Sequence, residues 1–108
     1  MSDWIDAADF DELVQGRSLR AALGSEVLLL VKDGDRVFAI GNQCTHQGAG
    51  LDRGVVRLAG SVRTVTCPAH GSVFRLDDGK VMRPPAMKPA LVYDVKVEDG
   101  RVFVRLRS

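Results

Sequence analysis

The chain has 108 residues and a mass of 11.7 kDa, the size of one ordinary domain that can bury a core. Its composition is 45% hydrophobic and 27% charged, with 15 Lys and Arg against 14 Asp and Glu, which excludes a disordered, collagen-like or coiled-coil chain. The longest strongly apolar run, Val27–Val31, is far shorter than the roughly 20 residues that a membrane-spanning helix needs. We therefore expect a soluble protein with no membrane partner.

The N-terminal segment is acidic, with Asp3, Asp6 and Asp9 where a secretory signal peptide would carry basic residues and then an apolar stretch. A cytoplasmic location is therefore expected. The first predicted element is a single capped helical turn within Ala7–Val14, which is too short to organise a fold.

Short apolar runs, alternating or clustered rather than spaced as in a helix, predict β-strands further along the chain. These runs are Val27–Val31, Val37–Ile40, Val62–Thr66, Leu91–Val97 and Val102–Leu106. Turn signals at 33–35 and 98–100 separate the first two and the last two runs, so two antiparallel hairpins are expected. The predicted fold class is all-β, with an antiparallel sheet that buries one face.

The middle of the chain differs from its ends. Residues 41–90 hold most of the glycines and all four prolines, and strand signals are sparse there. We expect a single domain over 1–108, in which about 1–43 and 91–108 form a β base and about 44–90 form an inserted, loop-rich subdomain.

The balance of acidic and basic residues also changes at this boundary. Residues 1–43 hold eight acidic and four basic side chains, whereas residues 44–90 hold three acidic and seven basic ones. The small overall excess of +1, with no basic repeat interleaved with aromatics, excludes a nucleic-acid partner. We expect a basic collar facing an acidic partner surface, formed by some of Arg53, Arg57, Arg63, Arg75, Lys80, Arg83 and Lys88.

All the cysteines and histidines of the chain lie in two short motifs, Cys44-Thr45-His46 and Cys67-Pro68-Ala69-His70. A disulfide is disfavoured, because cytoplasmic thiols stay reduced and two cysteines make no disulfide framework. Four scarce residues in two matched pairs favour a metal site. Two thiolates and two imidazoles suit tetrahedral zinc, but each motif mixes the ligand types at an unusual spacing for zinc. This mixture favours a two-iron cluster, with zinc as the alternative.

The flanking residues resemble the Rieske iron–sulfur family. The stretches 44–51 (CTHQGAGL) and 67–74 (CPAHGSVF) are similar to the family's two cluster loops. The pattern continues through Gly79, Pro84-Pro85-Ala86, Pro89, Tyr93 and the Asp99-Gly100 turn. The linker Asp52–Thr66 is longer than in many soluble members. The resemblance implies a Rieske-type antiparallel β sandwich or barrel base with an inserted cluster-binding subdomain.

The resemblance also implies the cofactor and its ligands. It implies one [2Fe–2S] cluster, with Cys44 and Cys67 on a buried iron and His46 and His70 on an outer iron. Pro84-Pro85 is expected to form a stiff third loop over the cluster.

The same resemblance narrows the function. A Rieske oxygenase needs a second, mononuclear iron site with further histidines, and none remain. Cytochrome bc-type Rieske proteins carry a membrane anchor and an extra disulfide, whose cysteine positions are Ala49 and Ala69 here. The resemblance therefore implies a free-standing, monomeric ferredoxin and not an enzyme. Such a carrier takes single electrons from an NAD(P)H-dependent flavoprotein reductase and passes them to the terminal oxygenase of a dioxygenase system.

Two alternatives stay open. One is the small subunit of an assimilatory nitrite reductase, which shares this module. The other, from a different class, is a zinc-stabilised interaction domain.

Residues near the second motif carry expectations about potential and packing. In high-potential family members a serine and a tyrosine, two and four residues after the second ligand histidine, donate hydrogen bonds to the cluster and to a cysteine sulfur. This chain has a serine, Ser72, at the first of these positions and Phe74 in place of the tyrosine at the second. The reduction potential of the cluster is therefore expected to lie low in the roughly −150 to +300 mV Rieske range. At least one of Met82 and Met87 is expected to fill the core.

Overall fold

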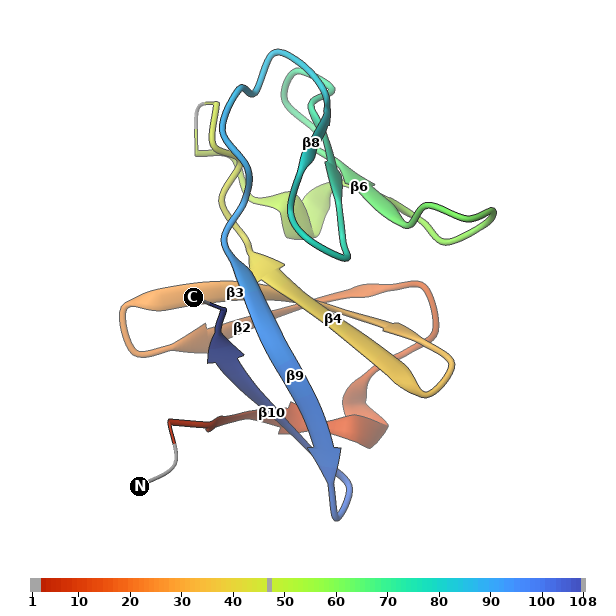
Figure 1. The fold of residues 1–108 in the computed structure, drawn as a ribbon, viewed down its shortest axis with the longest axis vertical. Coiled ribbons are helices and arrows are strands. Elements are labelled where there is room, and N and C mark those ends of the chain that lie inside the picture. The colour runs from red at the N-terminus through yellow and green to blue at the C-terminus, as the bar shows by residue number, and fades with distance from the viewer. Residues whose placement is uncertain (1–2, 47, 108) are drawn as a thin grey trace.

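The computed structural model describes residues 3–46 and 48–107. Two antiparallel sheets lie one above the other along the long axis of the molecule (Figure 1). The larger sheet, in the order β1-β10-β9-β4-β3-β2, curls into a nearly closed barrel, and the smaller sheet has the order β5-β6-β7-β8. The all-β prediction is confirmed.

The elements have the following bounds. The larger sheet contains β1 (Ile5–Asp9), β2 (Ser18–Leu23), β3 (Glu26–Asp33), β4 (Arg36–Gly41), β9 (Val92–Glu98) and β10 (Arg101–Leu106). The smaller sheet contains β5 (Val55–Arg57), β6 (Thr64–Thr66), β7 (Val73–Arg75) and β8 (Val81–Arg83). Two single-turn 3-10 helices are η1 (Phe10–Glu12) and η2 (Leu51–Arg53).

Both predicted hairpins are confirmed. Strand β3 pairs with β4, and β9 pairs with β10 through the register Glu98↔Arg101. The two residues of the second turn, Asp99 and Gly100, have φ of 51° and 76°. A two-residue turn with both φ positive matches the twist of the flanking strands, and an Asp-Gly pair supplies this conformation at low cost.

The prediction of a helical turn within Ala7–Val14 is wrong for the first half of that segment. Residues through Asp9 belong to β1, where Ala8 pairs with Val102 of β10. Only Phe10–Glu12 form a helical turn, which is a 3-10 helix. Its cap is the carboxylate of Asp9, which accepts a hydrogen bond from the N–H of Asp11 at 3.1 Å. Pairing with β10 gives the segment before Asp9 more hydrogen bonds than one isolated helical turn could.

Strand β3 supplies side chains to both hydrophobic cores, which explains its unbroken apolar run. Leu28 and Leu30 are buried with Tyr93 and the residues of β10 inside the barrel. The alternating positions Leu29 and Val31 are buried in a second core beneath the smaller sheet. A strand covered on both faces needs continuous rather than alternating apolar residues.

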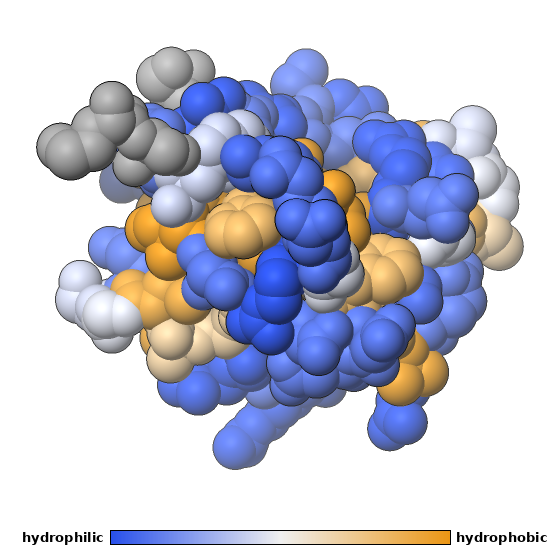
Figure 2. All heavy atoms as spheres, turned by 90° about the horizontal axis from the view of Figure 1, so that it is seen from below, coloured by the Kyte–Doolittle hydropathy of each residue, from blue (hydrophilic) through white to orange (hydrophobic). Residues whose placement is uncertain are grey.

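The far end of the barrel is mainly polar. Figure 2 views this end, where hydrophilic side chains surround smaller apolar areas. In the described part of the chain, no helix has the length and apolar character needed to cross a membrane.

Candidate metal centre

Three loops gather at the end of the molecule opposite the β9–β10 turn (Figure 1). Loop 1 (residues 43–50) follows β4, loop 2 (67–72) connects β6 to β7, and loop 3 (84–90) leads from β8 toward β9. Both Cys/His motifs lie in the first two loops, and the third is the proline-rich segment that the sequence placed beside them.

The structure places the two cysteines of the motifs in one core and the two histidines next to each other at the surface. Cys44 and Cys67 are free thiols, each only 2% exposed, and both belong to the core beneath the smaller sheet. His46 and His70 are exposed, and their rings meet edge to face with centroids 5.3 Å apart. The site therefore has two buried sulfur donors and two neighbouring imidazoles at the surface.

Loop 1 is closed by backbone hydrogen bonds on either side of the first motif. Gln43 forms an antiparallel bridge with Gly50, and the N–H of Cys44 donates to the carbonyl of Ala49 at 2.8 Å. The N–H of Gly48 donates back to the carbonyl of Cys44 at 2.7 Å. Gln47 lies outside the described residues. These bonds hold the cysteine at the base of the loop and leave the histidine at its tip.

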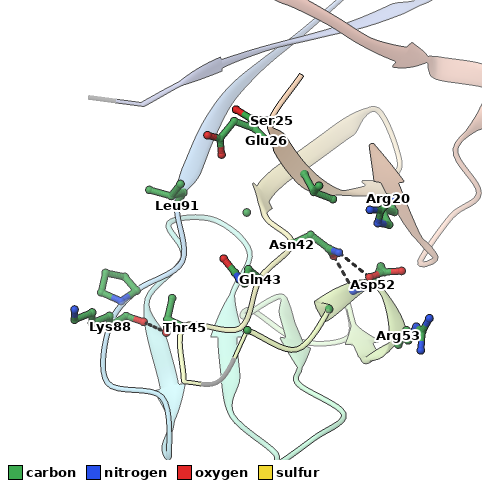
Figure 3. Close-up of a pocket in the computed structure, with 15 residues that line it drawn as sticks. Arg20, Ser25, Glu26, Asn42, Gln43, Thr45, Asp52, Arg53, Lys88 and Leu91 are labelled. Carbon is green, nitrogen blue, oxygen red and sulfur yellow. Dashed lines mark hydrogen bonds between the residues drawn. The ribbon is translucent and has the colours of Figure 1, made fainter. Parts of the chain in front are cut away.

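A reciprocal side-chain pair fastens the base of loop 1. The amide Nδ2 of Asn42 donates to Oδ1 of Asp52 at 2.7 Å, and the N–H of Asp52 donates to Oδ1 of Asn42 at 2.8 Å (Figure 3). The carbonyl of Asp52 also accepts the hydroxyl of Ser18 in β2, at 2.8 Å. Gly50 leaves room for this pair, since a Cβ there would lie 2.7 Å from the Asp52 carboxylate. We call these two residues the Asn42–Asp52 clasp.

Loop 2 is a tight connection between two paired strands. The N–H of Cys67 donates to the carbonyl of Ser72 at 2.7 Å, and the N–H of Gly71 donates to the carbonyl of Cys67 at 3.1 Å. Cys67 directly follows β6 and stays buried, whereas His70 lies at the exposed turn. The short Cys-x-x-His spacing thus fits a turn that separates an inner from an outer ligand.

A close backbone contact joins the segment that follows loop 1 to the strand that precedes loop 2. Gly54, which ends η2, lies so near β6 that a Cβ on it would be 1.9 Å from the carbonyl oxygen of Thr66. Thr66 immediately precedes Cys67. Only a residue without a side chain permits this approach.

Loop 3 is hydrogen-bonded to both ligand loops. The N–H of Ala86 donates to the buried Oγ of Ser72 in loop 2 at 2.9 Å. The hydroxyl of Thr45 in loop 1 donates to the carbonyl of Lys88 at 2.6 Å, beside a groove of about 880 Å³ (Figure 3). The third loop thus spans the gap between the two motifs.

The expectation that a methionine of this region fills the core is wrong. Met82 is 49% exposed and Met87 is 91% exposed. The core beneath the smaller sheet is instead filled by branched and aromatic residues such as Leu51, Val65 and Phe74. These residues are fully buried, whereas both methionines lie at the surface.

Two members of the expected basic collar are paired within the chain. Arg63 contacts Asp33 of β3 at 2.5 Å and, by this hydrogen bond, lowers the pKa of that carboxyl group. Arg75 pairs with Asp78 and lowers its pKa from 3.8 to about 2. The remaining five are exposed and make no ion pair with any described residue: Arg53, Arg57, Lys80, Arg83 and Lys88.

The donor set fits a two-iron cluster. Thiolates and imidazoles are the ligands of a Rieske centre, with both sulfurs on one iron and both nitrogens on the other. Buried thiols and paired surface imidazoles divide the donors in this way. Within residues 3–46 and 48–107, no group of three or more His, Cys, Asp or Glu side chains is arranged to hold one metal ion.

Sequence reasoning missed the residues that support the ligands. Neither the Asn42–Asp52 clasp nor the Thr45–Lys88 hydrogen bond was anticipated. An Asn and an Asp at the two ends of a glycine-rich loop are the only sequence signal for the clasp, and such polar residues are common in any turn.

Comparison with known proteins identifies the family. Residues 3–105 match the model of the Rieske-like [2Fe–2S] domain. The chain is 33% identical to the ferredoxin component of the naphthalene 1,2-dioxygenase/salicylate 5-hydroxylase systems of a Ralstonia species, covering 96% of each chain. It is 35% identical to human apoptosis-inducing factor 3 over 95% of its own length, but spans only 17% of that protein.

Solved structures agree with this result. The ferredoxin of carbazole 1,9a-dioxygenase from Nocardioides aromaticivorans IC177 superposes with a TM-score of 0.88 at 31% identity, over 95% of this chain and 97% of that one. A chain assigned as the NADH-dependent nitrite reductase small subunit of Mycobacterium tuberculosis superposes with a TM-score of 0.82 at 31% identity, over 97% and 95%. The relatives matched over their whole length include ferredoxin components, which are electron carriers and not catalytic subunits. The chain belongs to the Rieske-like [2Fe–2S] family, whose cofactor is a Rieske [2Fe–2S] cluster.

Proposed function

We propose that Cys44 and Cys67 bind the inner iron of the cluster, that His46 and His70 bind the outer iron, and that residues 44–90 form the cluster-binding subdomain. The observation that carries this assignment is the division of the donors into two buried thiols and two adjacent, exposed imidazoles. When bound, the cluster supplies a site that accepts and releases one electron at a time.

The chain's own residues determine where the electron enters and leaves. The two thiols lie in a core with Leu51 and Phe74, which excludes water from that side of the site. The two imidazoles are at the surface, so a partner that contacts them is separated from the cluster by one ring only. His46 and His70 are therefore the electron port.

The proposed partners are an NAD(P)H-dependent flavoprotein reductase as donor and a terminal oxygenase as acceptor. The support is the similarity to the ferredoxin components of dioxygenase systems along the full length of both chains. In the carbazole 1,9a-dioxygenase system, a similar ferredoxin forms a complex with its oxygenase. We place the carrier in the cytoplasm, where its two free thiols stay reduced until they bind iron.

A second candidate is the small subunit of a nitrite reductase. The nitrite reductase small subunit from Mycobacterium tuberculosis superposes nearly as well as the ferredoxins do. The fold and the ligand motifs do not separate the two functions, because both use the same module. Membership of a [2Fe–2S] family, in contrast, argues against the zinc-stabilised interaction domain.

Reconstitution separates the two redox functions. The purified holoprotein is mixed with NAD(P)H, a flavoprotein reductase and either a terminal oxygenase or a nitrite reductase large subunit, each taken from the neighbouring genes. Substrate hydroxylation that depends on this chain supports the carrier function. Nitrite reduction without any support of an oxygenase would contradict it.

The ligand assignment has its own test. His46→Ala and His70→Ala are each expected to abolish the Rieske visible and EPR spectra, because the chain has no third histidine. Ala69→Ser, a change of the exposed residue next to His70, is the matched control and should retain the spectra. An unchanged Rieske spectrum in either histidine variant would refute the assignment.

A further inference from the structure

The most exposed large apolar side chain in the described part of the chain lies beside the electron port. Met87 in loop 3 is 91% exposed, and Met82 at the end of the smaller sheet is 49% exposed. An exposed thioether contributes no burial energy to the fold, because its apolar surface stays hydrated. An isolated exposed apolar side chain is common on protein surfaces, so a partner contact is indicated by where Met87 is held relative to the two histidines and not by its exposure alone.

The residues on either side of Met87 both form hydrogen bonds with the ligand loops. The N–H of Ala86 donates to Ser72, two residues after His70, and the carbonyl of Lys88 accepts the hydroxyl of Thr45, next to His46. Figure 3 shows the second of these bonds. Met87 is therefore held at the crest of loop 3, at a fixed place relative to both histidines. A fixed loop loses little conformational entropy when a partner binds.

Two cations flank this crest in the sequence. Arg83 and Lys88 are exposed, and within the described residues neither forms an ion pair. Lys88 uses only its main-chain carbonyl in the bond to Thr45, so its ammonium group stays available. An apolar centre with a cationic rim is complementary to an apolar hollow bordered by carboxylates.

We infer that Met87 is the apolar anchor by which the terminal oxygenase recognises this carrier. The inference rests on the proposed function and specifies its docking surface. The oxygenase contributes an apolar hollow that receives the Met87 side chain, and acidic residues at its edge pair with Arg83 and Lys88. Because Ala86 donates to Ser72 of loop 2 and the Lys88 carbonyl accepts from Thr45 of loop 1, binding of Met87 in the hollow would also place the two histidines against the acceptor.

The acceptor is the occupant that fits these observations. The solved complex of the carbazole 1,9a-dioxygenase system joins a similar ferredoxin to its oxygenase, so the acceptor is a partner that such a carrier binds directly. An apolar contact next to the port would hold the histidines close to the oxygenase cofactor while one electron passes. A methionine suits this role because its flexible, polarisable side chain adapts to the shape of the hollow.

The test measures binding of the oxidised holoprotein to the oxygenase that it supports in the reconstituted system. Met87→Ala and the nearly isosteric Met87→Gln are expected to weaken binding by about tenfold or more, the usual effect of truncating an interface anchor. The matched control is Val97→Ala, which trims a 40% exposed apolar residue beside the β9–β10 turn, at the other end of the molecule. The control should bind as the native chain does, and all variants should keep the native spectrum and midpoint potential.

Salt dependence separates the anchor from its cationic rim. Lys88→Gln should reduce the decline of affinity with ionic strength, whereas Met87→Ala should lower affinity and leave that dependence unchanged. Native affinity in Met87→Ala, an equal loss in Val97→Ala, or a loss toward the reductase alone would overturn the inference. Failure of the native chain to support any oxygenase would instead refute the proposed function, so the two results are distinguishable.

Discussion

The Oγ of Ser72 accepts a hydrogen bond of 2.9 Å from the backbone N–H of Ala86, and both residues are buried. This single bond connects the loop that carries His70 with the loop that carries Met87. Because the oxygen is the acceptor, the hydroxyl proton of Ser72 is not used in this bond and can be donated elsewhere. In high-potential members of the family the serine at this position donates its proton to the cluster, and we expect Ser72 to do the same.

Ser72→Ala is expected to have two separate effects. The N–H of Ala86 loses its acceptor in a buried place, which costs about 1–3 kcal/mol of unfolding free energy. Loss of the donated proton leaves the reduced cluster less stabilised, so the midpoint potential should decrease. Denaturant unfolding and an EPR-monitored redox titration measure the two effects independently. A lower stability with an unchanged potential would show that the serine acts only through Ala86.

Phe74→Tyr is expected to raise the midpoint potential. Phe74 is fully buried in the core that also holds Cys44 and Cys67, so a hydroxyl added to its ring would enter a buried, apolar region. There a hydrogen bond to a cysteine sulfur stabilises the more negative, reduced state. The measurement is the same redox titration, with Phe38→Tyr, in the same core, as the control. Equal potentials in Phe74→Tyr and the native chain would mean that the hydroxyl does not reach a sulfur.

The metal ligands could be predicted from the sequence because they are scarce residues in a local pattern. The same is true of the two hairpins, whose apolar runs and Asp-Gly turns lie within a few residues of each other. Strand β1 could not be predicted, since its pairing with β10 joins residues almost a full chain apart, as in Ile5↔Val104. Long-range pairing leaves no local signal in a short strand such as Ile5–Asp9.

The exposure of Met87 was unpredictable for a related reason. Methionine is common in cores, so its type alone favours burial. The loop on either side of it is held by two hydrogen bonds, from the Ala86 N–H to Ser72 and from the Thr45 hydroxyl to the Lys88 carbonyl, and no sequence pattern records these partners. The Asn42–Asp52 clasp belongs to the same class of tertiary contact.

The clasp is expected to protect the cluster. Asn42→Ala removes both clasp bonds and leaves the N–H of Asp52 without its acceptor, at a cost of about 1–3 kcal/mol. Loop 1 should then open more often, and the visible absorption of the holoprotein should be lost faster in the presence of an iron chelator. Asp52→Asn is the matched variant, because it keeps the side-chain oxygen that accepts from Asn42. Equal rates of cluster loss in Asn42→Ala and the native chain would contradict this role.

Gly54→Ala is expected to prevent stable assembly of the two ligand loops. The backbone at Gly54, with φ of −84°, is ordinary, so the cost is steric: a Cβ would lie 1.9 Å from the Thr66 carbonyl oxygen. Relief requires β6 to move away from η2, which should cost at least about 2 kcal/mol. Gly41→Ala is the control, because its Cβ would make an ordinary contact of 3.5 Å with Leu91. Thermal unfolding and iron content compare the two variants.

Acid should weaken the smaller sheet through Asp78. Its hydrogen bond from Arg75 holds its pKa at about 2, below the ordinary 3.8, so the folded chain stabilises the charged carboxylate. The Asp78–Arg75 pair therefore contributes its full stabilisation above about pH 4, and this contribution is lost as the pH falls toward 2. Asp78→Asn removes the charge at every pH. The difference in unfolding free energy between the native chain and Asp78→Asn should therefore decrease as the pH is lowered from 5 toward 2. The control is Asp77→Asn, a change of the exposed neighbour. Its difference in unfolding free energy from the native chain should not decrease over this pH range. Denaturant unfolding of both variants at several pH values measures these differences. A gap that stays constant down to pH 2 would show that the negative charge of Asp78 does not stabilise the fold.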